Sequence, residues 1–122
     1  MKCGGTMYYI YIIRCTDSSL YCGITTDVSR RFSEHINGKS VGAKYTRSRK
    51  PKQIEMIWSC ETRSDALKLE SAIKKLTKIK KEELISDSSL FDDYFNKILD
   101  IKLYKFEQAK LNEIINRLQQ VP

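Results

Sequence analysis

The sequence predicts an α+β fold: a small three-stranded antiparallel sheet flanked by helices in the order β-β-α-β-α, followed by a C-terminal helical extension. Short runs rich in aromatic and β-branched residues, bounded by polar turns, are typical of strands. Longer segments repeat apolar residues every three to four positions, which is typical of amphipathic helices. A chain of 122 residues suits one domain with an appended tail, and the composition changes near residue 86. We therefore divide the chain into a core at 1–85 and an extension at 86–122.

The first two strands predict a hairpin that carries two tyrosines. Residues 8–14 (YYIYIIR) and 20–24 (LYCGI) are the strands, and the polar residues between them form the turn. Side chains alternate between the faces of a strand, so Tyr11 and Tyr21 share a face if odd-numbered positions are opposed. Tyrosine is common on strands. The pair is explained either by that preference or by two hydroxyls that bind a phosphate or a water.

A helix follows the hairpin, from capping side chains at residues 25–27 to a stop at Gly38. Arg31 and His35 lie one turn apart at the border of its apolar stripe, whereas Arg30 faces water. A guanidinium beside a sheet with two tyrosines is suited to binding a phosphate. His35 belongs either to that arrangement or to the core, as a hydrogen-bonded histidine.

A third strand and a second helix complete the predicted core. The strand covers residues 53–60, and its apolar residues alternate onto a single face: Ile54, Met56, Trp58 and Cys60. Thr62 and Asp65 are spaced as in a capping box, which opens a helix at about residues 64–78. One more helical turn is expected at residues 80–85.

Glu70 is the one carboxylate inside the apolar stripe of this second helix, beside Leu69 and Ile73. Burying a lone carboxylate is costly, so the group needs a cation, hydrogen bonds or a proton. A divalent metal ion and a salt bridge to an arginine or a lysine both satisfy that requirement. The residues alone leave both alternatives open.

The extension predicts one or two amphipathic helices. Its apolar residues at helical spacing are Phe91, Tyr94, Phe95 and Ile98, then Leu111, Ile114, Ile115 and Leu118. Such a stripe packs on the core, on a second copy of the chain or on another protein. The C-terminal helices are therefore the expected place for a homodimer or partner interface.

Basic charge is concentrated in the predicted core. The formal net charge is +7; residues 1–85 hold 17 basic and nine acidic side chains, against five and six in residues 86–122. The stretch 39–52 carries six basic side chains and no acid. A field of this kind favours polyanionic partners such as nucleic acids, although basic surfaces also serve solubility alone. The expected nucleic-acid contacts are Lys44, Tyr45, Arg47, Arg49 and Lys50.

Other classes of function find little support in the composition. The four cysteines and the single histidine lack zinc-site spacing, and free thiols in a reducing compartment are expected. No stretch approaches the ~18 apolar residues of a membrane span, and no leader is evident. We expect a protein without membrane contact that is not secreted, located in the cytoplasm or at the nucleoid, or in the nucleus if its source is a eukaryote.

These features together resemble the GIY-YIG nuclease family, most closely its small stand-alone bacterial, YhbQ-like branch. The first motif is matched by residues 9–11 (YIY) and the second by residues 21–23 (YCG). Three further stretches match: GITTDVSRRFSEH, GAKYTRSRKP and ALKLESAIKKL. Tyr9 stands where the family has glycine and Cys22 where it has isoleucine, and neither position carries chemistry in the family. The resemblance covers residues 7–85, and residues 86–122 have no counterpart in it.

The resemblance implies a role for each candidate residue. Tyr11 orients or deprotonates the attacking water, and Tyr21 assists it and the phosphate. Arg31 stabilises the pentavalent charge, and His35 supports the tyrosines or the phosphate. Glu70 holds a single divalent metal ion, Mg²⁺ or Mn²⁺.

The function implied is a metal-dependent endonuclease that hydrolyses DNA phosphodiester bonds in branched, flapped or nicked DNA during repair or recombination. The rival interpretation is a non-catalytic nucleic-acid-binding module that uses the same basic surface. Metal-dependent turnover on a panel of DNA structures separates the two.

Overall fold

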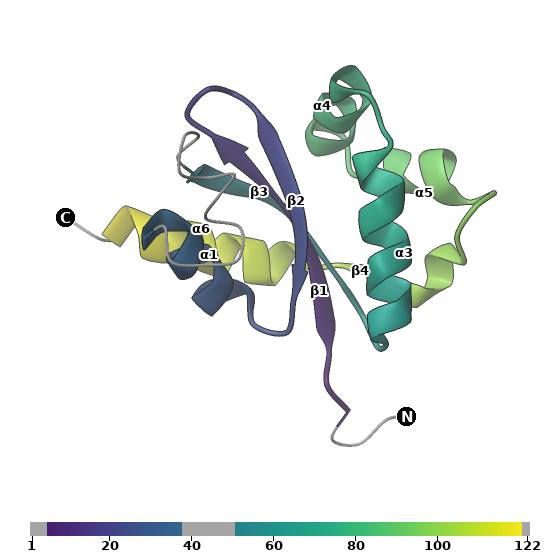
Figure 1. Cartoon of the computed structure of the whole chain (residues 1–122), viewed down its shortest axis with the longest axis horizontal. Coiled ribbons are helices and arrows are strands. Elements are labelled where there is room, and N and C mark those ends of the chain that lie inside the picture. The colour runs from purple at the N-terminus through teal and green to yellow at the C-terminus, as the bar shows by residue number, and fades with distance from the viewer. Residues whose placement is uncertain (1–4, 38–50, 121–122) are drawn as a thin grey trace.

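A computed structural model describes residues 5–37 and 51–120, with the backbone alone for residues 35–37 and 116–120. Its centre is an antiparallel sheet of strand order β2-β1-β3-β4 (Figure 1). The strands are β1 (Tyr8–Cys15), β2 (Leu20–Thr25), β3 (Pro51–Cys60) and β4 (Lys105–Phe106). The predicted α+β class with a C-terminal helical part is confirmed. The fourth strand corrects the predicted count of three, because residues 105–106 come from the extension and pair with β3.

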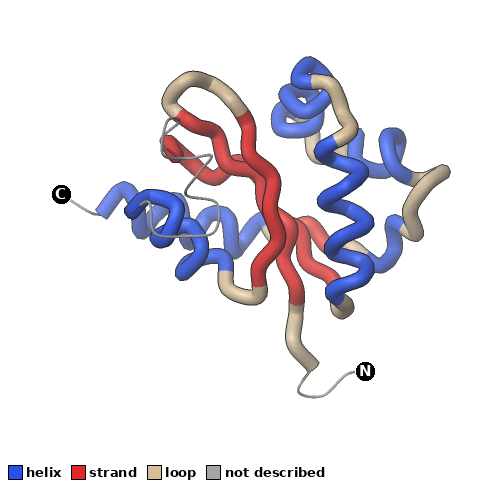
Figure 2. The backbone as a smooth tube through the Cα atoms, viewed as in Figure 1, coloured by secondary structure: helices blue, strands red, loops and turns tan. Residues whose placement is uncertain are grey.

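Helices cover both faces of the sheet. Figure 2 shows the strands in red between two groups of blue helices. One face carries α1 (Val28–Asn37) and α6 (Gln108–Gln120). The other carries α3 (Arg63–Lys74), α4 (Lys78–Ser86), α5 (Leu90–Phe95) and a short 3-10 turn, η1 (Ile101–Leu103). None of the helices in the described part of the chain is both long and apolar enough to cross a bilayer.

Strand alternation divides the core into two apolar clusters. Ile10 and Ile12 of β1 face α3 and α5, whereas Ile13 faces α1 and α6. A bulge at Glu55 shifts the register of β3, because Ile12 pairs with Met56 and Ile13 pairs with Ile54. The expectation that Ile54 shares a face with Met56 is therefore wrong: Ile54 joins the α1–α6 cluster. Regular alternation resumes on the other side of the bulge.

The helix starts follow the predicted capping chemistry. The backbone N–H of Asp65 donates to the Thr62 hydroxyl at 3.1 Å, which confirms the capping box. Asp27 caps α1 in the same way, accepting from the N–H of Arg30 at 3.1 Å. The second predicted helix ends earlier than expected, because α3 stops at Lys74. The further helical turn expected at residues 80–85 is part of a separate helix, α4, whose start Thr77 caps.

The C-terminal residues pack into both clusters. Phe91 lies 5.5 Å from Trp58 between ring centroids, and Phe95 is buried beside it. On the opposite face, Leu111 of α6 is buried against β3. Ile98 follows the end of α5 and is 66% exposed, so it does not extend the buried stripe as the spacing predicted. The division into two units at residue 85 stays a prediction.

Arg14 ties α4 to the hairpin. Its guanidinium donates to Glu55 at 2.6 Å and to Glu82 of α4 at 2.7 Å. Lys78, at the start of α4, donates to the carbonyl oxygen of Ser18 in the β1–β2 turn. These bonds hold α4 against the turn that leads into β2.

Candidate active site

Tyr11 and Tyr21 lie side by side on the sheet face that carries α1 and α6. In the β1–β2 register, Tyr11 pairs with Gly23 and Ile13 pairs with Tyr21, so odd positions are opposed. The two ring centroids are 6.4 Å apart and the planes are tilted by 45°. The prediction that the two tyrosines share a face and lie close together is confirmed.

Gly23 provides the space that the Tyr11 ring occupies. A Cβ at this position would lie 2.5 Å from the Tyr11 hydroxyl oxygen and 3.2 Å from Cε2 of Tyr21. Real Cβ atoms essentially never approach another heavy atom as closely as 2.5 Å. The motif match included this glycine without giving it a role, although the hairpin register would have placed it opposite Tyr11.

Arg31 of α1 completes the cluster on this face. Its side chain is 18% exposed and hydrogen bonds to the Tyr11 side chain. Glu34, three residues later, accepts from Arg31 at 3.4 Å, and the sequence patterns did not single it out. Among the described residues, the buried Nε of Arg31 has no hydrogen-bond partner. Arg30 is 58% exposed, as predicted for the solvent side of the helix.

Burial sets the protonation state of this cluster. It raises the pKa of Tyr11 well above its ordinary value, and the hydrogen bond from Arg31 offsets only part of that effect. Burial by itself would lower the pKa of Arg31, but the bonds to Tyr11 and Glu34 keep it raised. At neutral pH the pair is therefore a phenol and a guanidinium, both able to donate hydrogen bonds to an anion.

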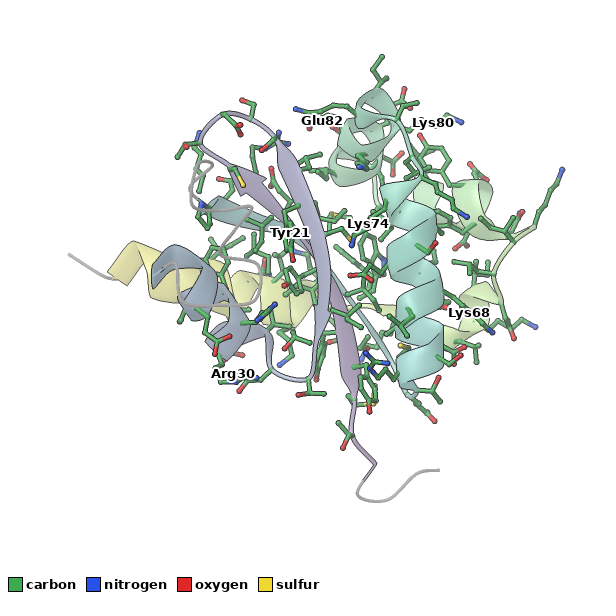
Figure 3. All side chains as sticks on the ribbon, viewed as in Figure 1. Tyr21, Arg30, Lys68, Lys74, Lys80 and Glu82 are labelled. Atoms are coloured by element: carbon green, nitrogen blue, oxygen red, sulfur yellow. The ribbon has the colours of Figure 1, made fainter. Side chains whose placement is uncertain are left out.

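Glu70 lies across the sheet from the tyrosines. It belongs to α3, whose buried side packs on the opposite face. Its side chain is 19% exposed and lies 3.5 Å from the ammonium of Lys74. Figure 3 shows Tyr21 and Lys74 on the two sides of β2. Since β2 is an edge strand of the described sheet, Glu70 approaches the same free edge from the other face.

Charged side chains of α3 and α4 lie close to Cys22, the residue between Tyr21 and Gly23. Burial, together with the nearby Glu70 carboxylate, raises the pKa of the Cys22 thiol to about 12, although Lys74 and Lys81 offset part of that increase. Such mutual influence requires the three charged groups to lie near the middle of β2. Lys81 is a residue that no sequence pattern had marked as a candidate.

The remaining candidates fall outside what the structure describes. His35 is placed in α1, but its side chain is not described. The expected nucleic-acid contacts lie wholly outside the described residues: Lys44, Tyr45, Arg47, Arg49 and Lys50. Their assignments stay predictions.

Glu70 is the candidate metal ligand among the side chains that the structure describes. No three His, Cys, Asp or Glu residues among those side chains are grouped closely enough to bind a metal. Glu70 offers hard oxygen ligands at a half-buried position. One carboxylate fits Mg²⁺ or Mn²⁺ when water and substrate phosphate supply the other ligands.

The chain is similar to several UPF0213 proteins. The chain is 44% identical over 98 residues to UPF0213 protein FN1575 of Fusobacterium nucleatum, covering 80% of this chain and 96% of that protein. It is 53% identical over 74 residues to UPF0213 protein H16_B0156 of Cupriavidus necator, covering 61% and 78%. The solution NMR structure of UPF0213 protein BH0048 from Bacillus halodurans is 37% identical, covers 76% of this chain and 98% of its own, and has a TM-score of 0.44.

The model of one family matches most of the chain. Residues 7–83, from the residue before β1 to the middle of α4, match the GIY-YIG catalytic domain. This range contains Tyr11, Tyr21, Arg31 and Glu70. The chain therefore belongs to the GIY-YIG catalytic domain family, as its two tyrosine motifs predict, and that is a family of endonucleases.

Proposed function

We propose that this protein is a divalent-metal-dependent endonuclease that hydrolyses phosphodiester bonds in DNA. The observation that carries the proposal is the meeting of the Tyr11 phenol, the Tyr21 ring and the Arg31 guanidinium beside β2, an edge strand of the described sheet. Branched, flapped or nicked DNA, as formed during repair or recombination, is the proposed substrate class. A phosphate at an edge strand can be contacted from both faces of the sheet.

Arg31 is the proposed stabiliser of the pentavalent transition state. Its charge is fixed at neutral pH, and it is held by Tyr11 and Glu34 with little exposure to water. A guanidinium held in this way acts on developing phosphoryl charge without first reorganising. Glu34 then has the role of orienting Arg31.

Tyr11 suits orientation better than proton abstraction. A phenol whose pKa is raised by burial is a poor base at pH 7, and it remains a good hydrogen-bond donor and acceptor. Tyr11 thus positions the attacking water or a phosphoryl oxygen, and Tyr21 contacts the phosphate from the more exposed position.

Glu70 is the proposed residue for holding Mg²⁺ or Mn²⁺. When bound, such an ion supplies positive charge to the phosphoryl and leaving oxygens. Glu70 contacts Lys74, so binding of the ion replaces one partly exposed ion pair by another. Lys74, Lys78 and Lys81 then line the approach to β2 and are proposed, together with the basic stretch 39–52, to contact DNA phosphates.

The test compares Glu70→Gln with Lys74→Ala on labelled duplex, flap, fork and four-way DNA in Mg²⁺ or Mn²⁺. Both changes remove the same ion pair, a partly exposed i,i+4 pair worth about 0.3–0.5 kcal/mol, so both variants should melt close to the parent. Only Glu70→Gln removes the metal ligand. We expect it to lose at least a hundredfold in cleavage rate while DNA affinity is kept, and Lys74→Ala to cleave within about tenfold of the parent.

Two results would contradict the proposal. Metal-dependent cleavage by Glu70→Gln at the parent rate would show that Glu70 is not the metal ligand. Binding of the DNA panel with no cleavage by the parent protein in either metal would favour the non-catalytic binding module.

A further inference from the structure

An open groove runs along the outer side of α3, away from the candidate active site. Its volume is about 700 Å³, and the segment after α5 forms its second wall. Lys68, which lines the groove, is about 160° around the helix axis from Glu70. Figure 3 shows Lys68 on the side of α3 that faces away from the sheet and Lys74 on the side towards β2.

The floor of the groove is apolar. Leu67 of α3 is 38% exposed and Ile98 is 66% exposed, and both line the groove together with Ala72 and Leu99. From Ser64 to Lys75 the lining residues of α3 repeat every three or four positions. That stripe extends over about three turns, or roughly 16 Å. Such a surface matches the length and shape of a short helix laid alongside α3.

The rim of the groove is basic. Three cationic side chains line it, Arg63, Lys68 and Lys75, and no acidic residue does so among those described. Within the described part of the chain none of the three is in a salt bridge, whereas Lys74 and Lys78 pair with glutamates. The groove therefore combines unneutralised positive charge with exposed apolar side chains.

We propose that this groove binds an acidic amphipathic helix of a partner protein. The apolar residues of such a helix cover Leu67 and Ile98, and its carboxylates meet the three cations at the rim. Nucleic acid matches the charge but leaves the apolar floor without a partner. The inference does not rest on the proposed nuclease activity, because the groove and the tyrosine cluster lie on different sides of α3.

A designed peptide tests the proposal on the full-length protein. It carries leucine at positions i, i+3, i+4 and i+7 of a helix and glutamate on the remaining face, with a fluorophore for anisotropy. Two matched peptides serve as controls: one with lysine in place of each glutamate, and one with the same composition in scrambled order. The acidic helix should bind saturably, and both controls at least tenfold more weakly.

Charge reversal in the protein locates the binding site. Lys68→Glu with Lys75→Glu should weaken binding of the acidic peptide at least tenfold and strengthen binding of the lysine peptide. The matched variant, Lys80→Glu with Lys105→Glu, changes the net charge equally but alters no groove residue, and should bind like the parent. Leu67→Ser with Ile98→Ser should also weaken binding at least tenfold, although it leaves every charge in place.

Several outcomes would overturn the proposal. One is that Lys68→Glu with Lys75→Glu and Lys80→Glu with Lys105→Glu weaken binding of the acidic peptide equally. Binding would then respond to net charge in general. Another is that the scrambled peptide binds as tightly as the acidic helical peptide. Duplex DNA that displaces the peptide from the parent protein, and whose own binding is weakened by Lys68→Glu with Lys75→Glu but not by Lys80→Glu with Lys105→Glu, would identify the groove as a nucleic-acid surface. Sedimentation showing a dimer that dissociates in Leu67→Ser with Ile98→Ser would identify the occupant as a second copy of this chain.

Discussion

The hydroxyl of Tyr11 lies over Gly23, its directly opposed partner on β2, so closely that a Cβ there would be 2.5 Å from the oxygen. The tyrosine of the first motif thus packs directly on the glycine of the second motif. The ring crosses the neighbouring strand only because that strand has no side chain at this position. This close approach fixes the position of the phenol that Arg31 then bonds.

Gly23→Ala should displace Tyr11 and reduce cleavage at least tenfold. Overpacking of this kind also costs about 1–3 kcal/mol of unfolding free energy, measurable by urea denaturation. Tyr11→Phe in the Gly23→Ala background should not restore stability, because ring carbon Cζ would still lie 2.7 Å from the new Cβ. Full activity in Gly23→Ala would show that the position of Tyr11 is not needed.

Phe91→Ala should destabilise the whole protein by about 3–5 kcal/mol, because it opens a cavity against the indole of Trp58. Trp58 is the only tryptophan, so its fluorescence reports the change directly, as a shift of emission to longer wavelength. Ile98→Ala, in an exposed position nearby in sequence, is the control and should have little effect.

Truncation after Ile85 should abolish soluble expression, because it removes α5, β4 and α6 from both core clusters. A truncated protein that stays soluble, keeps its oligomeric state and cleaves DNA normally would make residues 86–122 an independent appendage. Circular dichroism and sedimentation of the truncated chain distinguish the two results.

Glu82→Gln should lower stability by about 1 kcal/mol at pH 7 and have no effect at low pH. The hydrogen bond from Arg14 lowers the pKa of Glu82 below its ordinary value of 4.5. A carboxyl group with a lowered pKa stabilises the fold above that value and loses its contribution as the pH falls through the folded-state pKa. Urea unfolding at pH 7 and at about pH 3 checks this, with the exposed Glu61→Gln as control.

The combined change of Lys44, Arg47, Arg49 and Lys50 to alanine should weaken DNA binding and flatten its salt dependence. For each phosphate that the variant no longer neutralises, the slope of log K against log salt should fall by about 0.9. Anisotropy titrations with duplex DNA at several salt concentrations give the slope. An unchanged slope would move the main phosphate-binding surface to Lys74, Lys78 and Lys81.

The tyrosine cluster could be predicted because it depends on local rules. Hairpin parity placed Tyr11 and Tyr21 together, and the helical period turned Arg31 inward and Arg30 outward. Capping side chains likewise gave the starts of α1 and α3. Each rule needs only neighbours within one element or one turn.

Features that depend on residues distant in sequence were missed. The bulge at Glu55 reverses the face of Ile54, and a period-two pattern contains no sign of it. The two residues of β4 are too few for a strand pattern, and they pair because α5 and η1 bring them to Trp58. The relation of Glu70 to the tyrosines across β2 also depends on helix placement, which the apolar stripe of α3 alone does not determine.

The two outer strands of the sheet differ in their exposure to aggregation. Beyond β3 the ladder ends in β4, whose two residues offer too short a template for another chain. Strand β2 is longer and has no strand on its outer side in the described sheet, but lysines of α3 and α4 lie close to it. Positive side chains beside such an edge discourage intermolecular strand pairing. Neutralising Lys74, Lys78 and Lys81 should therefore promote β-type association between molecules, even where the fold itself is unchanged.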